Sequence, residues 1–478
     1  MKSNKILSAL VHHVGHELTK SQEVASYLLS NFFVSKKDHQ VFLLKGYAGT
    51  GKTTLIAACV KTLLSFGVKV VLLAPTGRAA KVIAQYSGYS AYTIHKWIYR
   101  KQSQKDALGK FVLNRNNSSN TIYIVDEASM ISATSAESSV FGSGNVLEDL
   151  IEFVDNGDNC RLMLVGDEAQ LPPVRLDRSP ALDKGVIESY GYQVTDITLM
   201  EVVRQAADSG ILTNATELRT MIANNQCVIP KFNVIGFDDV VRLSGMELVE
   251  MLETSYSKVG LNDTIVISYS NKRANKYNQG IRNQILWREE ELSIGDLLMV
   301  VRNNYFWVEQ HSDINFIANG DIVEVVRIRG TKNLHGFRFA DVTVRLLDYQ
   351  EQEVDVVIML DTLAVDGPSL PKDRVNDLYE SVNLDYADII NKRNRFKKVK
   401  SDPYFNALQV KYAYAVTCHK AQGGQWKHVY IDQGFFRDDM LTKEYLRWLY
   451  TAFTRATEKV FLVNFAKEFY TNDFEETF

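Results

Sequence analysis

A glycine-rich segment near the N-terminus has the residue types that bind phosphate. "GYAGTGKT" matches the pattern G-x-x-x-x-G-K-[ST]. Its glycines let backbone N–H groups close around phosphate oxygens, and the N-terminus of a following helix favours negative charge. In this pattern Lys52 reaches the β- and γ-phosphates, and the Thr53 hydroxyl holds Mg²⁺. The segment therefore predicts a nucleoside triphosphate site with Mg²⁺; the alternative is a chance glycine loop. The predicted binding residues are Gly46, Ala48, Gly49, Thr50, Gly51, Lys52, Thr53 and Thr54.

Acidic and amide residues follow two further apolar runs. Asp126 and Glu127 end the run in "IYIVDEAS", and Asp167 and Gln170 follow the run in "LVGDEAQLPPV". Asp126 suits Mg²⁺ binding, and Glu127 suits orientation or deprotonation of an attacking water. Gln170 is a candidate for sensing the γ-phosphate or positioning water. A solvated acidic turn and an ordinary polar loop are the respective alternatives.

Hydrolysis of a triphosphate also needs positive charge at the transferred phosphoryl group. Arginine fingers supply that charge and contribute on the order of 10³–10⁵ in rate. Two candidates lie well beyond the first motifs, Arg204 in "MEVVRQA" and Arg455 in "YTAFTRATEKV". For either arginine, a surface salt bridge is the alternative.

The elements that must position these residues are strands and helices in alternation. "VFLLKG", "KVVLLAPT", "TIYIVDEAS" and "RLMLVGDEAQ" are short and nearly continuous apolar runs, and helical stretches separate them. Such runs are typical of parallel strands buried on both faces. Ligands of open α/β sheets bind at the carboxyl ends of the strands. We therefore expect the polar residues that end all four runs to face one site.

The 478 residues are too many for a single core, so we expect several domains. The first α/β domain is predicted over 1–197, with the polar stretch 97–120 as an inserted hairpin or a surface loop. A second α/β pattern begins near "TDITLMEVVRQ" and gives a discontinuous domain over 198–283 and 410–478. Short alternating runs predict a small antiparallel barrel or sandwich within 284–409, followed there by a charged segment.

Composition bounds the class of protein. Hydrophobic residues make up 46%, charged residues 23%, and the net charge is −3, which argues against a generally basic, DNA-coating protein but not against a local basic channel. Four well-separated cysteines indicate neither a disulfide framework nor a zinc site. No apolar run reaches transmembrane length, and "ILSALVHHVGHE" is too short for a signal peptide, so we expect a cytoplasmic protein without membrane contact.

In this order, the segments resemble the motif series of superfamily 1 helicases, in particular the RecD and Dda branch. "LTKSQEVA" resembles the glutamine motif, which places Gln22 at the adenine. "GYAGTGKTT", "APTGRAAK", "VDEASM", "GDEAQLPPV" and "VVRQ" resemble motifs I, Ia, II, III and IV, and "TIHKW" resembles the T-x-H element. "AVTCHKAQGGQW" and "YTAFTRAT" resemble motifs V and VI, although Ser-Gln-Gly is more usual than Ala-Gln-Gly in motif V. The resemblance spans residues 18–460.

The resemblance implies an ATP-dependent DNA helicase that moves 5′ to 3′ on single-stranded DNA and unwinds duplexes. It implies two RecA-like P-loop NTPase domains, an SH3-like barrel insertion in the second and a short hairpin insertion in the first. The implied catalytic residues are Lys52, Asp126, Glu127, Gln170, Arg204 and Arg455, and Gly423 joins the ATP-binding set. The implied DNA-binding residues are Pro75, Thr76, Arg78, His95, Thr417, His419 and Lys420. Single-stranded and forked DNA are the expected partners of a monomer, with replication, repair or recombination proteins.

Several of these assignments have alternatives. His95 and His419 also fit structural, hydrogen-bonded histidines. Trp97, Tyr99 or Phe111 could stack on bases, although Trp97 suits a core position better. The run "KRNRFKKVK" fits an electrostatic rail for DNA or a solvated charged face.

Other functions compete with unwinding. The chain could be a single-strand translocase or an ATP-gated DNA-binding protein without strong unwinding activity. It could also be the helicase subunit of a recombination nuclease complex. A P-loop kinase or GTPase is a further class, but "SNKRA" has Ala274 where the guanine-reading N-K-x-D pattern needs aspartate.

Overall fold

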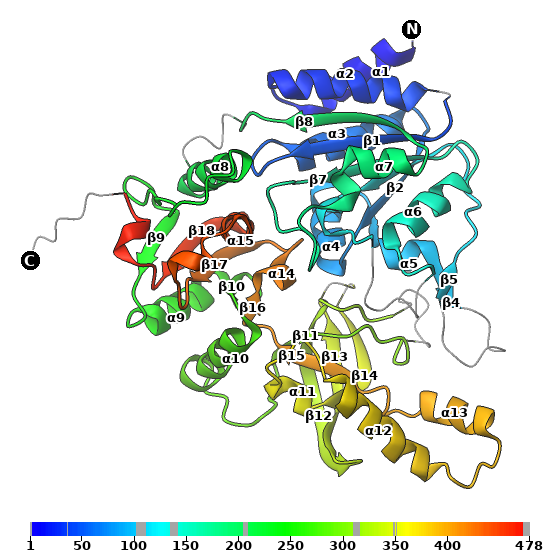
Figure 1. Cartoon of the computed structure of the whole chain (residues 1–478), viewed down its shortest axis with the longest axis vertical. Coiled ribbons are helices and arrows are strands. Elements are labelled where there is room, and N and C mark those ends of the chain that lie inside the picture. The colour runs from blue at the N-terminus through cyan, green and yellow to red at the C-terminus, as the bar shows by residue number, and fades with distance from the viewer. Residues whose placement is uncertain are drawn as a thin grey trace, which may run out of the picture.

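The computed structural model describes most of the chain. The described residues are 2–35, 37–101, 111–133, 142–203, 209–308, 316–347, 349 and 351–471. They form two lobes, each built on a parallel sheet, and a small barrel (Figure 1). This is the α/β architecture that the alternating apolar runs predict.

The first lobe contains a parallel six-stranded sheet with the strand order β3-β2-β6-β7-β1-β8. Its strands are β1 (Gln40–Gly46), β2 (Lys69–Ala74), β3 (Ala91–Thr93), β6 (Thr121–Val125), β7 (Arg161–Gly166) and β8 (Gln193–Leu199). Its helices are α1 (Lys2–Val14), α2 (Lys20–Val34), α3 (Lys52–Ser65), α4 (Gly77–Ser87), α5 (Ile94–Ile98), α6 (Val146–Asp155) and α7 (Lys184–Ser189). Every residue of β6 and β7 is buried, as expected of central strands covered by helices on both faces.

Two details of the first lobe refine the sequence analysis. The segment "TDITL", expected near the start of the second α/β pattern, lies in β8 and pairs in parallel with β1. Strands β4 (Tyr99–Lys101) and β5 (Phe111–Leu113) pair antiparallel, which confirms the hairpin insertion rather than a surface loop. The residues between these two strands lie outside the described part of the chain.

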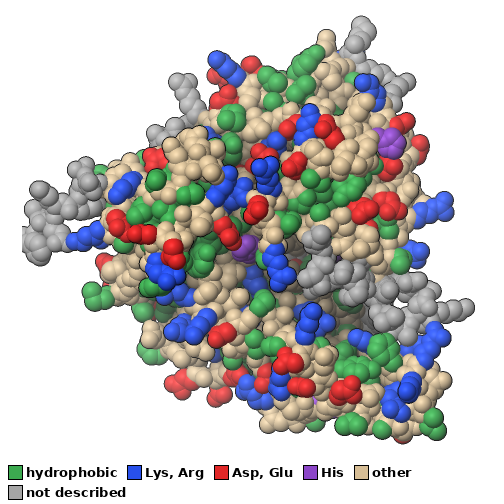
Figure 2. Space-filling view, viewed as in Figure 1, with side chains coloured by type: hydrophobic (Ala, Val, Ile, Leu, Met, Phe, Trp, Pro, Cys, Tyr) green, Lys and Arg blue, Asp and Glu red, His purple; other side chains and the backbone are tan. Residues whose placement is uncertain are grey.

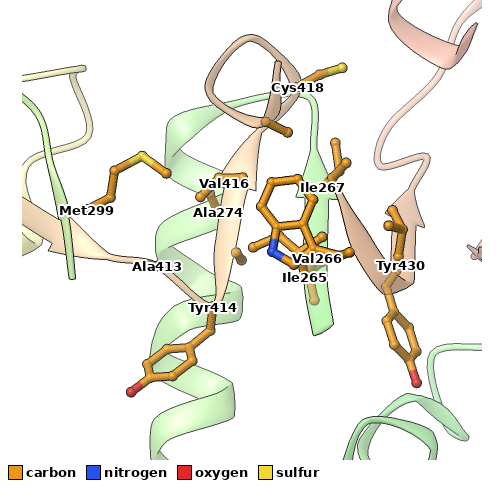
Figure 3. Close-up of a cluster of buried hydrophobic side chains, with 14 of the residues drawn as sticks. Ile265, Val266, Ile267, Ala274, Met299, Ala413, Tyr414, Val416, Cys418 and Tyr430 are labelled. Atoms are coloured by element: carbon orange, nitrogen blue, oxygen red, sulfur yellow. The ribbon is translucent and has the colours of Figure 1, made fainter. Parts of the chain in front are cut away.

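The second lobe contains a parallel five-stranded sheet with the strand order β16-β10-β17-β18-β9. Its strands are β9 (Val240–Leu243), β10 (Thr264–Ser268), β16 (Ala415–Thr417), β17 (Trp426–Asp432) and β18 (Ala456–Val463). Its helices are α8 (Gly210–Ala223), α9 (Leu248–Val259), α10 (Asn271–Gly280), α14 (Cys418–Ala421) and α15 (Lys443–Phe453). Figure 3 shows its core, where Ile265, Val266 and Ile267 of β10 lie among side chains of β16 and β17.

The barrel is closed by β11 (Leu297–Val300), β12 (Ile322–Leu334), β13 (Phe337–Leu346), β14 (Gln352–Met359) and β15 (Leu408–Tyr412). Its pairs are antiparallel except β14 with β15, which is parallel. The closed barrel confirms the predicted β-rich insertion and leaves no open sheet edge. Helices α11 (Asp361–Ala364), α12 (Lys372–Asp385) and α13 (Lys392–Lys400) accompany the barrel, and α13 carries the basic run "KRNRFKKVK" far from the first lobe (Figure 1).

The lobes and the barrel meet around a hollow. Figure 2 shows this hollow in the middle of one face, with Lys and Arg side chains along its margin, although the net charge of the chain is −3. No helix within the described ranges has both the length and the apolar character needed to cross a membrane.

Candidate functional site

The glycine-rich loop joins β1 to the N-terminus of α3. Gly49 and Gly51 have φ angles of +74° and +82°, in the left-handed region that favours glycine. A Cβ atom on Gly51 would lie 2.5 Å from Gln22 Nε2, so a side chain there would displace the glutamine. Gln22 Nε2 donates a 3.0 Å hydrogen bond to the Thr50 carbonyl, and Lys52 Nζ donates to the Gly46 carbonyl at 2.8 Å. The predicted loop residues and Gln22 are therefore one structural unit.

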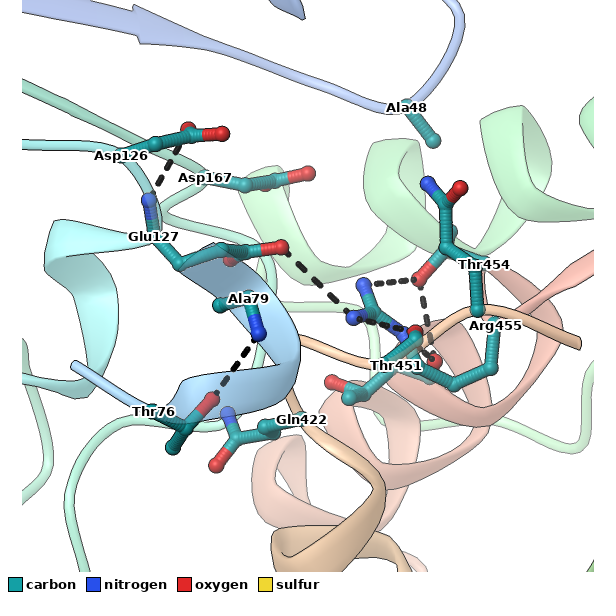
Figure 4. A network of polar contacts seen from close by, with 12 residues as sticks. Ala48, Thr76, Ala79, Asp126, Glu127, Asp167, Gln422, Thr451, Thr454 and Arg455 are labelled. Carbon is teal, nitrogen blue, oxygen red and sulfur yellow. Dashed lines mark hydrogen bonds and ion pairs between the residues drawn. The ribbon is translucent and has the colours of Figure 1, made fainter. Parts of the chain in front are cut away.

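Asp126 and Glu127 follow β6, at the same edge of the sheet as the loop. The Glu127 backbone is left-handed with φ +52°, and its N–H donates to Asp126 Oδ1 at 2.9 Å (Figure 4). Burial raises the pKa of Asp126 to about 7, and the neighbouring Glu127 carboxylate adds to the rise. A buried carboxyl group beside a second carboxylate suits a cation ligand.

Asp167 follows β7, which lies between β6 and β1 in the sheet. This buried carboxylate accepts a 2.6 Å hydrogen bond from the Tyr450 hydroxyl and lies 3.9 Å from Lys52 Nζ. The same hydroxyl accepts a 2.8 Å bond from the Ala48 N–H. Tyr450 belongs to α15 of the second lobe, so one hydroxyl joins that lobe to two phosphate-site segments of the first.

Gln170 is buried, and its Oε1 atom has no hydrogen-bond partner among the described residues. Burying an unpaired amide oxygen costs about 1–3 kcal/mol, so such atoms in native proteins call for an explanation. A water or ligand donor at this position would satisfy it. The water-positioning or phosphate-sensing role of Gln170 stays a prediction.

Arg455 reaches the first lobe from the C-terminal end of α15. Its Nη1 atom lies 3.6 Å from Glu127 Oε1, although only 3% of the residue is exposed (Figure 4). The guanidinium is held from behind because Nε donates to the Thr451 carbonyl at 3.2 Å and Nη1 donates to the Gly424 carbonyl at 3.3 Å. The other predicted finger, Arg204, lies outside the described residues.

These residues fit a Mg²⁺–nucleotide complex. The left-handed glycines form the cradle, Lys52 begins α3, and Thr53 and Asp126 offer oxygen ligands. No cluster of three or more His, Cys, Asp or Glu side chains in the described ranges could hold a metal ion alone. Phosphate-binding sites hold Mg²⁺ through one or two carboxylates plus the phosphates and water.

Two predicted DNA-binding residues of the first lobe, Thr76 and Arg78, lie against residues 423–426 of the second lobe, which closely follow Thr417, His419 and Lys420 in the chain. Thr76 caps α4 by accepting a 3.2 Å bond from the Ala79 N–H, and its Oγ1 atom lies 3.2 Å from where Gly423 would carry a Cβ. Arg78 stacks over the ring of Trp426 at 4.0 Å and donates to the Gln425 carbonyl at 3.1 Å. Thr417 begins α14 without using its side chain as a cap. Pro75 precedes Thr76 at the same end of β2.

The titratable residues among the predicted DNA-binding residues lie in different environments. Burial lowers the pKa of His95 to about 4, and its ring lies 5.6 Å from the ring of Tyr99, which favours the structural alternative for this histidine. Burial also lowers the pKa of His419. Burial, with repulsion from Lys411, lowers the pKa of Lys420 to about 8, and Lys420 Nζ has no hydrogen-bond partner within the described part of the chain. Such an ammonium can bind an anion that reaches it.

The aromatic candidates lie at the base of the hairpin. Tyr99 is buried and donates a 2.6 Å bond to Asp149, and Phe111 packs 4.4 Å from the ring of Tyr305 next to the barrel. Trp97 packs 4.9 Å from the ring of Tyr92 at the margin of the core. In this arrangement the rings of Tyr99 and Phe111 are used for packing rather than presented to bases.

Sequence reasoning missed the residues that connect the lobes. Tyr450, Thr451 and Gln422 lie within quoted motifs, yet no role was assigned to them. Gln422 Nε2 donates to the Leu171 carbonyl at 2.6 Å, and the Leu171 N–H donates to Thr451 Oγ1 at 2.9 Å. Their polar side chains inside apolar surroundings were the available signal, but their partners lie more than two hundred residues away in the chain.

Fold and site together define a P-loop nucleoside triphosphatase with two RecA-like lobes. Residues 31–225 match the family model described as an AAA domain, and residues 412–463 match the UvrD-like helicase C-terminal domain. These two matches cover the loop that carries Lys52 and the segment that carries Arg455, respectively.

Relatives match over different lengths. The ATP-dependent DNA helicase dda of Enterobacteria phage T4 is 25% identical, over 94% of this chain and 99% of that protein. The ATP-dependent RecD2 DNA helicase of Deinococcus radiodurans is 32% identical over 37% of this chain and 21% of that protein. A solved Pif1 helicase from Bacteroides, in complex with ADP-AlF3 and ssDNA, is 14% identical, with a TM-score of 0.46 and coverage of 96% and 95%. The two family matches and these relatives support a superfamily 1 helicase of the Dda and RecD-like group.

Proposed function

We propose that the protein is an ATP-dependent DNA helicase that moves 5′ to 3′ on single-stranded DNA and unwinds duplexes. One observation carries the proposal: Arg455 of the second lobe lies 3.6 Å from Glu127, beside the phosphate loop of the first. A site that takes essential charge from both lobes depends on their relative position. Nucleotide binding and hydrolysis can then favour different lobe arrangements, which is what a motor requires.

The proposed roles in hydrolysis follow from position. The loop N–H groups and Lys52 bind the phosphates, while Thr53 and Asp126 hold Mg²⁺, which neutralises charge on the phosphate oxygens when bound. Glu127 orients and deprotonates the attacking water, and Gln170 supplies a further hydrogen bond to it. Arg455 stabilises the negative charge of the transition state.

The proposed DNA path crosses both lobes at the contact between α4 and the segment that follows β16. Thr76 and Thr417 are the N-cap residues of α4 and α14 on opposite sides of this contact, and helix N-termini favour phosphate. Lys420 adds, close by in sequence, an ammonium that has no hydrogen-bond partner among the described residues. Non-specific backbone contacts of this kind suit a protein that must pass any base sequence.

The test is ATP hydrolysis with and without single-stranded DNA, beside unwinding of duplexes with a 5′ or a 3′ single-stranded tail. We expect stimulation by single strands and unwinding of the 5′-tailed duplex. Preference for the 3′ tail would contradict the direction, and hydrolysis without any unwinding would favour the translocase alternative. Lys52→Ala is the control, since it removes hydrolysis while single-strand binding persists.

A further inference from the structure

A cavity of about 380 Å³ lies between the two lobes, next to the glycine-rich loop. The first lobe contributes Lys45, Tyr47 and residues that follow β7, and the second lobe contributes residues of α8 and α15. The proposed ATP ligands and catalytic groups, Lys52, Thr53, Asp126, Gln170 and Arg455, are absent from its lining. The cavity is therefore distinct from the ATP site proposed above.

Cationic side chains dominate this cavity. Its lining contains the cations Lys45, Arg178, Lys184, Arg219, Lys443 and Arg447, and the carboxylates Glu168 and Asp183. Lys45 is neutralised by Glu168 at 3.2 Å and by Asp196 at 2.9 Å. Asp183 caps α7 by accepting a 2.9 Å bond from the Gly185 N–H. Lys184 pairs with Glu188 of α7 at 3.6 Å. Among the described residues, Arg178, Arg219, Lys443 and Arg447 have no ion pair, so the cavity keeps an excess of positive charge.

Two of the guanidinium groups are fixed in place but incompletely bonded. Arg219 donates to the Met200 carbonyl at 3.2 Å and lies 4.7 Å over the ring of Tyr47, whereas Arg447 donates to the Asp177 carbonyl at 2.5 Å. Arg219 Nη1 and Arg447 Nε are nevertheless buried without a hydrogen-bond partner among the described residues. Both side chains line the cavity, so an anion there can bind donors of their guanidinium groups that no acceptor among the described residues occupies.

We propose that this cavity binds a small di- or triphosphate anion, which bridges Arg219, Lys443 and Arg447 of the second lobe to Arg178 and Lys184 of the first. The volume is within the range of small-ligand sites, and guanidinium groups match phosphate oxygens in geometry. Because the ligand contacts both lobes, it stabilises their observed arrangement. Tyr47 of the glycine-rich loop also lines the cavity, so the anion adjoins the ATP site.

The experiment uses the full chain with Lys52→Ala, which weakens phosphate binding at the glycine-rich loop. Inorganic pyrophosphate and ATP are titrated separately by calorimetry, so the two arms distinguish a free polyphosphate from a nucleotide. The pocket variant adds Arg178→Ala and Lys443→Ala. The control adds Lys61→Ala and Lys69→Ala, which remove two exposed charges elsewhere on the first lobe.

We expect saturable binding of at least one of the two anions, weakened about tenfold or more in the pocket variant and within about twofold of the parent in the control. If anion binding weakened equally in both variants, the effect would be one of general electrostatics, and the proposed site would be overturned. The proposed site would also be overturned if neither anion showed saturable binding. This includes a result in which only an oligonucleotide binds. Melting temperatures of the two variants check that both remain folded.

Discussion

Among single residues, Arg455 allows the most direct test, because several contacts hold its guanidinium group in place. Arg455→Lys keeps a positive charge but loses the planar fork that bonds Thr451 and Gly424 and reaches Glu127. We expect turnover to fall by about 10³-fold or more, whereas ADP affinity changes by less than about threefold. Steady-state hydrolysis and nucleotide titration measure the two effects. Near-normal turnover of a folded variant would show that Arg455 is not a finger.

A second prediction at this scale concerns Lys420, whose pKa burial lowers to about 8. The charged form is present below that pH and is lost as the pH rises through it. We expect single-strand affinity to fall about tenfold between about pH 7 and pH 9 in the parent, but not in Lys420→Arg, which stays charged. Lys400→Arg is the control, because burial also lowers the pKa of Lys400, which lies in α13 beside the barrel. The same pH profile in Lys420→Arg and the parent would exclude Lys420 from DNA binding.

At the scale of elements, the parallel strands were predictable because each is a short apolar run followed by polar residues. The glycine-rich loop was predictable because backbone geometry restricts its residue types. The assignment of β8 to the first sheet was not predictable from the sequence. An edge strand with half-buried residues has the same local pattern in either lobe. The contacts of Tyr450 and Gln422 were not predictable either, because they depend on how the two lobes dock.

The hairpin of β4 and β5 allows a prediction about unwinding. Phe111 of β5 packs 4.4 Å from the ring of Tyr305, which anchors the base of the hairpin beside the barrel. Phe111→Ala removes this ring contact, and we expect unwinding of a forked duplex to fall several-fold, with single-strand-stimulated hydrolysis within about twofold of the parent. Phe66→Ala, which removes an exposed ring on the first lobe, is the control. Equal losses of unwinding and hydrolysis would mean that the ring supports the whole fold rather than strand separation.

At the scale of the whole molecule, the ATP and DNA sites share one interface. Gln422 follows the segment that carries Thr417 and Lys420, and it donates to the Leu171 carbonyl, directly after Gln170. This contact is therefore a direct physical connection between the two proposed sites. Coupling between two ligands is reciprocal: each must change the affinity of the other by the same factor.

Gln422→Ala tests that connection. The parent should bind single-stranded DNA more tightly with a non-hydrolysable ATP analogue, and the analogue more tightly with DNA, by one common factor of about 5–150. In the variant this factor should fall towards one, while each ligand alone binds within about threefold of the parent. Gln433→Ala is the control, because Gln433 is also buried in the second lobe but bonds Ala466 of that lobe. If Gln422→Ala leaves the common factor unchanged, the coupling passes through other contacts. The next contact to test is the Tyr450 hydroxyl, which bonds Ala48 and Asp167.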